Sequence, residues 1–273
     1  MALSTSQILA AGVSLILAAS PAGAQSGEKV PADLHRAGPA NPGLSAECLV
    51  PDEELFALAP LETVKAALDE KRPVKVLALG SPAMSALGTG SGSYPSWLEH
   101  ELERLLPGSD FILEHRATSG ETMEDASERI KAIVAEAEPD LVIWKVGTTE
   151  VLARTDTEEF ARSLDETVKW LKEHDIDVVL VDPQYTARLA GDADYNRLVA
   201  SLEAVARANA VPLVFRSKAV RYLTEQRSNA GQNPFQLNEL GYRCMAEHVM
   251  RAVLLSIRQS GESPAQGQTE RPK

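Results

Sequence analysis

Aromatic residues, cysteines and positive charges are all scarce in this chain of 273 residues. Phe, Trp and Tyr make up 5% of it, cysteine occurs twice, and 27 Lys and Arg face 39 Asp and Glu, which gives a formal charge of −12. Two cysteines exclude a disulfide-rich scaffold, and a hydrophobic content of 44% excludes a wholly disordered chain. The acidic balance argues against nucleic acid as a partner, because such binding takes a basic stripe. We expect one domain with its own hydrophobic core.

The chain also lacks a hydrophobic run of membrane-spanning length. The longest, residues 8–19, is shorter than the ~20 residues that a transmembrane helix needs, so no stable membrane insertion is expected. The small residues at 22–24 follow it, in the pattern that signal peptidase recognises. We therefore predict a signal peptide over residues 1–24, cleavage before Gln25, and a periplasmic or secreted protein. No Lys or Arg precedes the run, and an apolar, disordered N-terminus is the alternative.

The two cysteines are Cys48 and Cys244, far apart in the sequence. In an exported chain such a pair predicts one disulfide, which would fasten the N-terminal arm to the last helix. Two separate buried thiols are the alternative. Neither cysteine has a neighbouring His or second Cys, so the sequence offers no zinc site, and we predict neither a metal nor a cofactor.

Between two Pro- and Gly-containing tails, short apolar runs alternate with longer amphipathic stretches. We predict a flexible linker over residues 25–46, a domain over 47–259 and a disordered tail over 260–273. The alternation is typical of a parallel sheet with helices on both faces. The five predicted strands are residues 74–79, 111–113, 141–144, 178–181 and 212–215.

Apolar residues at helical spacing predict five helices in the same domain. They cover residues 94–106, 123–137, 157–173, 193–209 and 238–258, with N-caps at Ser93, Thr122 and Asn238. Ligands bind such sheets at the carboxyl ends of the strands. The loops to search for a site therefore begin at Gly80, His115, Lys145, Asp182 and Arg216.

Two familiar motifs fail on inspection. The glycine-rich stretch 88–93 lacks the Gly-Lys-Ser/Thr ending of a phosphate-binding loop and does not follow a strand directly. His100 and Glu101 resemble half of a zinc-protease motif, but Arg104 stands where the second His belongs. Neither stretch predicts nucleotide or metal binding.

Four sequence blocks lie at strand ends in a recognisable order. They are residues 76–82 with 93–98, Gly120, residues 143–150 and residues 233–242. Together they resemble the SGNH/GDSL hydrolase family over about residues 48–255, and residues 181–185 and both cysteines fit one secreted branch of it. The resemblance implies an α/β fold, a three-layer α/β/α sandwich of flavodoxin-like type with a five-stranded parallel sheet.

The residues that this family uses for catalysis are replaced here. At the position of the nucleophilic serine stands Pro82, which has neither a hydroxyl nor a backbone N–H for the oxyanion hole. Gly120 keeps the family identity of the second oxyanion donor. The family's oxyanion-binding Asn corresponds to Thr149.

The acid and the base of the family are replaced as well. The family's Asp-x-x-His corresponds to Asn233 and Gln236, and neither amide transfers protons near neutral pH. The resemblance therefore implies an inactive relative, a binding or accessory factor for acylated or neutral polysaccharide. The predicted ligand-binding residues are Ser81, Gly120, Thr149, Gln184, Asn233 and Gln236.

An active esterase or acylhydrolase is the alternative. It would cleave O-acyl esters through a rebuilt site, with Ser81 as fallback nucleophile and His115 as fallback base. An esterase predicts turnover that Ser81→Ala abolishes and labelling of the protein by a serine-directed fluorophosphonate, whereas a binding protein predicts neither. The sequence does not name the ligand or a protein partner.

Overall fold

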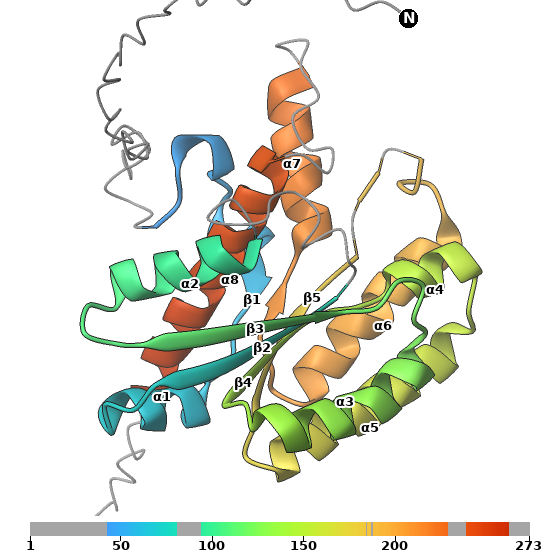
Figure 1. Cartoon of the computed structure of the whole chain (residues 1–273). Coiled ribbons are helices and arrows are strands. Elements are labelled where there is room, and N and C mark those ends of the chain that lie inside the picture. Colours follow the sequence, from blue (N-terminus) through green and yellow to red (C-terminus); the bar gives the residue numbers. More distant parts are fainter. Residues whose placement is uncertain (1–42, 81–93, 184, 187, 229–238, 262–273) are drawn as a thin grey trace, which may run out of the picture. The chain divides into compact units, whose positions relative to one another are not determined.

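The computed structural model describes residues 43–80, 94–183, 185–186, 188–228 and 239–261 (Figure 1). The chain divides into two units, residues 1–34 and 35–273, and every described residue belongs to the second. Five of the predicted site residues lie outside the described residues, as do the helix caps predicted at Ser93 and Asn238. Those site residues are Ser81, Pro82, Gln184, Asn233 and Gln236.

The described strands form one sheet in the order β1-β6-β5-β4-β2-β3. The strands are β1 Phe56–Ala57, β2 Val74–Gly80, β3 Phe111–Ala117, β4 Leu141–Lys145, β5 Asp177–Val181 and β6 Leu213–Val214. Strands β2 to β6 are parallel, whereas β1 runs antiparallel to β6. The parallel part has the strand order of a flavodoxin-like sheet, as predicted.

The described part of the chain has six strands, one more than the five that were predicted. The additional strand, β1, has two residues, which pair as Phe56 with Val214 and Ala57 with Leu213. Two residues cannot display the alternation by which a strand is recognised in a sequence. The sheet is therefore mixed, with a short antiparallel edge.

All five predicted helices are present, and the described residues form three more α-helices. The helices are α1 Glu62–Asp69, α2 Tyr94–Leu105, α3 Met123–Ala137, α4 Thr148–Ala153, α5 Thr157–Glu173, α6 Ala193–Ala208, α7 Arg216–Ser228 and α8 Glu239–Gly261. Helices α1, α4 and α7 were not predicted. The predicted cap of α3 is confirmed, since the Thr122 hydroxyl accepts a hydrogen bond from the Asp125 N–H. No described helix is long and apolar enough to cross a membrane.

Alternate residues of each central strand enter opposite cores. In β2, Val76 and Ala78 pack with α1, α2, α7 and α8, whereas Leu77 and Leu79 pack with α3, α5 and α6. Figure 1 shows these two groups of helices on opposite sides of the sheet. The three-layer α/β/α sandwich is thus confirmed. The central strands are buried on both faces and form continuous apolar runs, so they are easy to recognise in the sequence.

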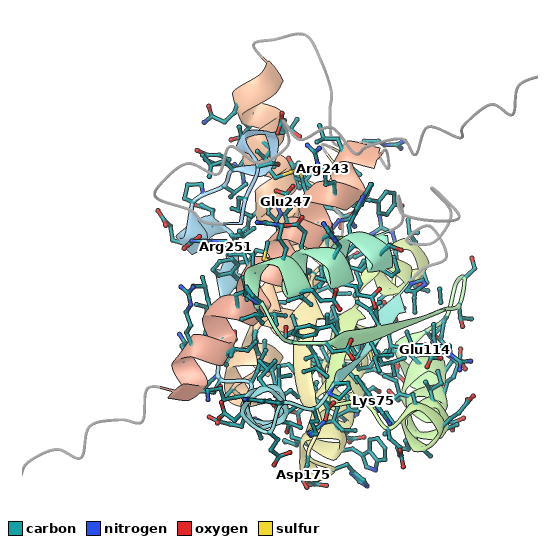
Figure 2. All side chains as sticks on the ribbon, turned by 60° about the vertical axis from the view of Figure 1, so that its left-hand side comes forward. Lys75, Glu114, Asp175, Arg243, Glu247 and Arg251 are labelled. Carbon is teal, nitrogen blue, oxygen red and sulfur yellow. A yellow bond between two sulfur atoms is a disulfide. The ribbon has the colours of Figure 1, made fainter. Side chains whose placement is uncertain are left out.

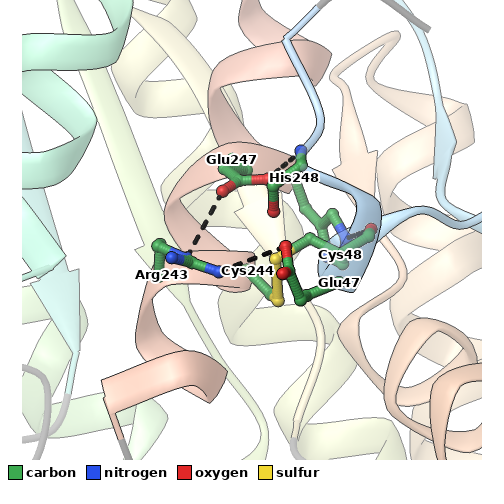
Figure 3. Close-up of a disulfide and its surroundings, with 7 residues drawn as sticks. Glu47, Cys48, Arg243, Cys244, Glu247 and His248 are labelled. Carbon is green, nitrogen blue, oxygen red and sulfur yellow. Dashed lines mark hydrogen bonds and ion pairs between the residues drawn. A yellow bond between two sulfur atoms is a disulfide. The ribbon is translucent and has the colours of Figure 1, made fainter. Parts of the chain in front are cut away.

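The predicted disulfide between Cys48 and Cys244 is present and fastens the N-terminal arm, residues 43–55, to α8 (Figure 3). Polar contacts surround it. The Ser45 N–H donates to Glu247 Oε2 at 2.7 Å, and His248 Nε2 donates to the Cys48 carbonyl at 2.7 Å. One side of α8 thereby carries the arm, along the stretch that includes Arg243, Glu247 and Arg251 in Figure 2.

Candidate functional site

A small cleft opens at the carboxyl ends of the central strands. It has a volume of about 70 Å³ and lies between the end of β2 at Gly80, the start of α3, and residues 144–150 of β4 and α4. The segment after β3 contributes residues 118 and 120–122. The cleft therefore occupies the edge of the sheet where parallel α/β proteins bind ligands.

Two glycines give the walls of this cleft their backbone shape. Gly147, the N-cap of α4, has a φ of +86°, and Gly120 has a φ of +69°. A Cβ on Gly147 would lie 2.8 Å from Leu198 Cδ2, so this turn needs glycine both for its conformation and for its packing. These turns place Thr148 and Thr149 in the wall of the cleft, facing the segment that contains Gly120.

Three basic side chains come together on one face of the sheet at the same edge. His115 is opposite Ala78 in the β2–β3 register, and Lys145 is opposite Val181 in the β4–β5 register. Ala78 and Val181 both face the core under α2 and α8, which places His115 and Lys145 on that face too. Arg216 begins α7 just after β6. We call His115, Lys145 and Arg216 the strand-end cation cluster.

The charges of this cluster act on one another. Burial, and then the charge of Arg216, lower the pKa of Lys145 to about 7. Burial and the charge of Lys145 lower the pKa of His115. Burial also lowers the pKa of Arg216, against the effect of Tyr242 and Asp182, which raise it. Because like charges are costly in a buried place, such a cluster is typical of a functional site.

The other polar groups around Arg216 include one acid and two tyrosines. Asp182, which is fully buried, accepts hydrogen bonds from Ser217 N–H at 2.8 Å and from the Ser217 hydroxyl. Burial raises the pKa of Asp182 to about 7. Tyr94 and Tyr242 are 1% and 4% exposed, and their buried hydroxyls have no hydrogen-bond partner in the part of the chain that the structure describes.

The comparisons with known proteins agree with this architecture. A family model described as the Non-GDSL lipase-like family matches residues 47–259. The chain belongs to this family. The predicted SGNH/GDSL hydrolase-like relationship is thereby confirmed, in a family whose description itself sets it apart from the GDSL lipases. Comparison with curated proteins gives no match for this Non-GDSL lipase-like chain.

Solved structures share the fold at low sequence identity. A two-domain esterase (CEX) active on acetylated mannans is 19% identical, with a TM-score of 0.59 over 80% of this chain and 58% of that one. The acetyl xylan esterase AlAXEase is 20% identical, with a TM-score of 0.55 over 66% of this chain and 100% of that one. A putative lipolytic protein of the G-D-S-L family from Desulfitobacterium hafniense is 17% identical, with a TM-score of 0.51 over 66% and 99% of the two chains. The Non-GDSL lipase-like chain thus has an SGNH esterase fold and spans little more than half the length of the two-domain esterase.

The predicted site residues that the structure describes fall into two groups. Gly120 and Thr149 line the same cleft, as the resemblance implied. His115, the fallback base, lies at the end of β3 in the strand-end cation cluster instead. Whether the remaining predicted residues complete the cleft stays a prediction, because they lie outside the described residues.

Sequence reasoning did not assign a role to several polar residues of this region. Lys145, Asp182, Tyr94 and Tyr242 lie in the stretches that carry the resemblance, and Arg216 begins a strand-end loop, but none of the five was given a role. The available signal was a charged residue directly after each of three apolar strands. Among the described residues, no group of three or more His, Cys, Asp or Glu is placed to hold a metal ion. The absence of a cofactor therefore stays a prediction.

Proposed function

We propose that this protein is an exported SGNH-like binding protein that does not hydrolyse esters and that holds an acylated carbohydrate at the cleft. The observation that carries the proposal is a mismatch. Gly120 and Thr149, which correspond by resemblance to two oxyanion donors of the family, line one cleft, while the sequence has Pro82, Asn233 and Gln236 in place of the nucleophile, acid and base. A cleft with hydrogen-bonding groups but without a proton-transferring pair suits the binding of a ligand rather than its hydrolysis.

The surroundings of His115 weigh against the alternative of a rebuilt esterase. A general base becomes an imidazolium when it takes the proton of the nucleophile. Burial and the neighbouring charge of Lys145 lower the pKa of His115 and so disfavour that form. His115 is thus a poor base for Ser81.

The choice of a carbohydrate ligand rests on the solved relatives. Two of them are described as active on acetylated mannans and as an acetyl xylan esterase. Hydroxyl and amide groups such as those of Thr149 and Gln236 suit the oxygens of an acylated or neutral sugar. An acetylated oligosaccharide is therefore the first ligand to test.

The test is to titrate the chain from Gln25 to Lys273 with acetylated and unacetylated mannopentaose while recording heat and released acetate. We expect binding without acetate release, and about tenfold weaker binding by Thr149→Val, the size expected for one lost hydrogen bond. The matched control is Thr63→Val in α1, whose hydroxyl donates to the Asp175 carbonyl at the opposite end of the strands. No binding of either sugar would overturn the proposal.

A variant with four substitutions, which restores the family's catalytic residues, tests whether the cleft lacks only those residues. It carries Pro82→Ser, Thr149→Asn, Asn233→Asp and Gln236→His. We expect this variant, and not the native chain, to hydrolyse a short activated acetate ester. Turnover by the native chain that Ser81→Ala abolishes would establish the esterase alternative instead.

The export part of the proposal has its own test. It is supported by the apolar run at residues 8–19 with small residues at 22–24, and by the disulfide, which is typical of an oxidising compartment. Mass spectrometry of the mature protein from its native host should find Gln25 as the first residue. A mature chain that keeps residues 1–24 would contradict cleavage.

A further inference from the structure

The outer edge of β3 is the longer of the two sheet edges in the described part of the chain. β3 is the last strand of the sheet and, among the described residues, pairs with β2 alone (Figure 1). It has seven residues, whereas β1 at the other edge has two. A long strand edge presents N–H and C=O groups that another strand can bind, so proteins commonly protect it with charged side chains or a covering element. An edge of this length is therefore a candidate interaction surface.

Helix α2 protects only the first half of this edge. Glu103 accepts a hydrogen bond from the Phe111 N–H at 3.4 Å, and the backbone of Leu113 forms a hydrogen bond with the carboxylate of Glu99. One turn before Glu99 the helix has Pro95 in place of an acid. The second half of the strand, residues 114–117, therefore lacks this protection.

β3 carries an exposed apolar residue and two opposite charges on one face. Ile112, Glu114 and Arg116 lie on the side of the sheet that α3 covers, because the β2 partners of Glu114 and Arg116 pack in the core on that side. The helices do not reach over β3, however. Ile112 is 52% exposed, and the side chains of Glu114 and Arg116 are 41% and 40% exposed. These three residues are thus accessible to a partner that pairs with the strand edge.

The two charges are complementary to a second copy of the same strand. When two copies of β3 lie antiparallel, with residue 115 of one opposite residue 115 of the other, Glu114 of each copy faces Arg116 of the other. Moving this centre by one residue in either direction sets Glu114 against Glu114 or Arg116 against Arg116. Like charges directly opposite each other are destabilising. The charges therefore select one symmetric register.

The same register covers the exposed apolar residue. Ile112 then lies diagonal to Arg116 of the second copy, within reach of the aliphatic part of that side chain. The side chain of residue 115 points to the opposite face of the sheet, so its contacts there are retained. The register thus satisfies the charges and the apolar surface together.

We propose that two copies of this chain associate through their β3 edges, antiparallel, to form one continuous sheet. The inference does not depend on the proposed function. A second copy fits better than an unrelated peptide, because the pair Glu114 and Arg116 is complementary to its own reversed sequence. Within one copy Arg116 pairs with Glu114 and, at 3.3 Å, with Glu136. Exposed pairs of this kind contribute little, so exchanging them for pairs between the copies costs little.

The experiment is sedimentation velocity of the full chain, with its disulfide oxidised, over a series of protein concentrations. We expect a dimer whose share rises with concentration. Glu114→Arg and Arg116→Glu each set like charges against one another at two symmetric places, so each variant alone should dimerise at least about tenfold more weakly. An equimolar mixture of the two variants should dimerise as the native chain does. In the mixed dimer, each residue at position 114 again faces the opposite charge at position 116.

Two further variants separate the edge from general effects of charge and folding. Arg221→Glu is the matched control, because it reverses the same charge in an exposed ion pair, 2.9 Å from Glu225 on α7, and it should dimerise as the native chain does. Ala117→Pro leaves the charge unchanged. Its N–H, like that of Phe111, points away from β2, so proline removes a donor of the proposed interface and none of the existing ladder. This variant should be folded by circular dichroism and monomeric.

Three results would overturn the proposal. The first is a native chain that stays monomeric up to about 1 mM, since even a millimolar Kd would give dimers there. The second is a dimer that persists unchanged in both charge-reversal variants, because the contact then lies elsewhere. The third is a pair of monomeric variants that do not associate when mixed, which contradicts the antiparallel register. The sugar titration decides the proposed function separately.

Discussion

Gly147 lines the cleft and forms a turn that leaves no room for a side chain. Its φ of +86° is left-handed, which costs a residue with a Cβ about 1–2 kcal/mol. The added Cβ would also meet Leu198 Cδ2 at 2.8 Å and Pro183 Cδ at 3.3 Å, and overpacking costs about 1–3 kcal/mol. We therefore expect Gly147→Ala to lower the free energy of unfolding by about 2–5 kcal/mol, measured by urea denaturation.

Gly120 supplies the matched control for this prediction. Its φ of +69° is also left-handed, but among the described residues, its two chain neighbours aside, no atom lies within 4 Å of the position that a Cβ would take. Gly120→Ala should thus cost only the conformational part, about 1–2 kcal/mol. Equal losses for the two variants would show that the contact with Leu198 relaxes without cost.

At the scale of elements, the sequence predicted the helices that are long and that carry a continuous apolar stripe. Helices α3 and α5 begin and end at the predicted residues, because their apolar stripes are long and have capping residues. Helix α7 was not predicted, because it buries few apolar residues, among them Ala219 and Leu223, in an otherwise polar stretch. Helix α4 has six residues, too few to show a periodicity.

The junction of β5 with α7 is held by Asp182, and its stability should depend on pH. Burial raises the pKa of Asp182 to about 7, whereas an exposed Asp has a pKa of about 3.9. Between these values the folded chain keeps a proton that the unfolded chain has lost, so this group makes stability fall as the pH rises. The slope is about 1.4 kcal/mol per pH unit at most, and it levels off above pH 7.

Asp182→Asn isolates this contribution. The amide oxygen of the variant can accept from the Ser217 N–H, and its NH₂ can donate to the Ser217 hydroxyl, so both present contacts keep a counterpart. We expect the free energy of unfolding of Asp182→Asn, relative to the native chain, to increase from pH 5 to pH 7 and to level off at about pH 8. Parallel pH profiles for the two proteins would contradict a raised pKa.

At the scale of the molecule, the sequence placed two candidate residues at one cleft but did not indicate the charged residues that gather near it. The blocks around Gly120 and Thr149 were placed at one cleft by resemblance, and the structure brings these two residues together. The cation cluster was not foreseen, because its members come from three separate strand ends. A sequence shows that Lys145 and Arg216 follow apolar runs, but only the strand order and register show that they share a face.

The largest covalent constraint on the whole molecule is the disulfide between Cys48 and Cys244, which are 196 residues apart. A cross-link over a loop of this length stabilises mainly by restricting the unfolded chain, by about 2–5 kcal/mol. The double variant Cys48→Ser, Cys244→Ser should lose that amount in urea denaturation. Addition of a thiol reductant should lower the stability of the native chain in the same way and leave the variant unchanged.

The same double variant should nevertheless keep its arm in place. Arg251 on α8 forms an ion pair with Asp52 at 2.7 Å, and the Ser45 N–H binds Glu247. The arm also buries Leu44 and Leu55, which need no disulfide to stay packed. Limited proteolysis under native conditions should therefore spare residues 43–55 in the double variant. Cleavage there at unchanged global stability would mean that the disulfide holds the arm locally instead of restricting the unfolded chain.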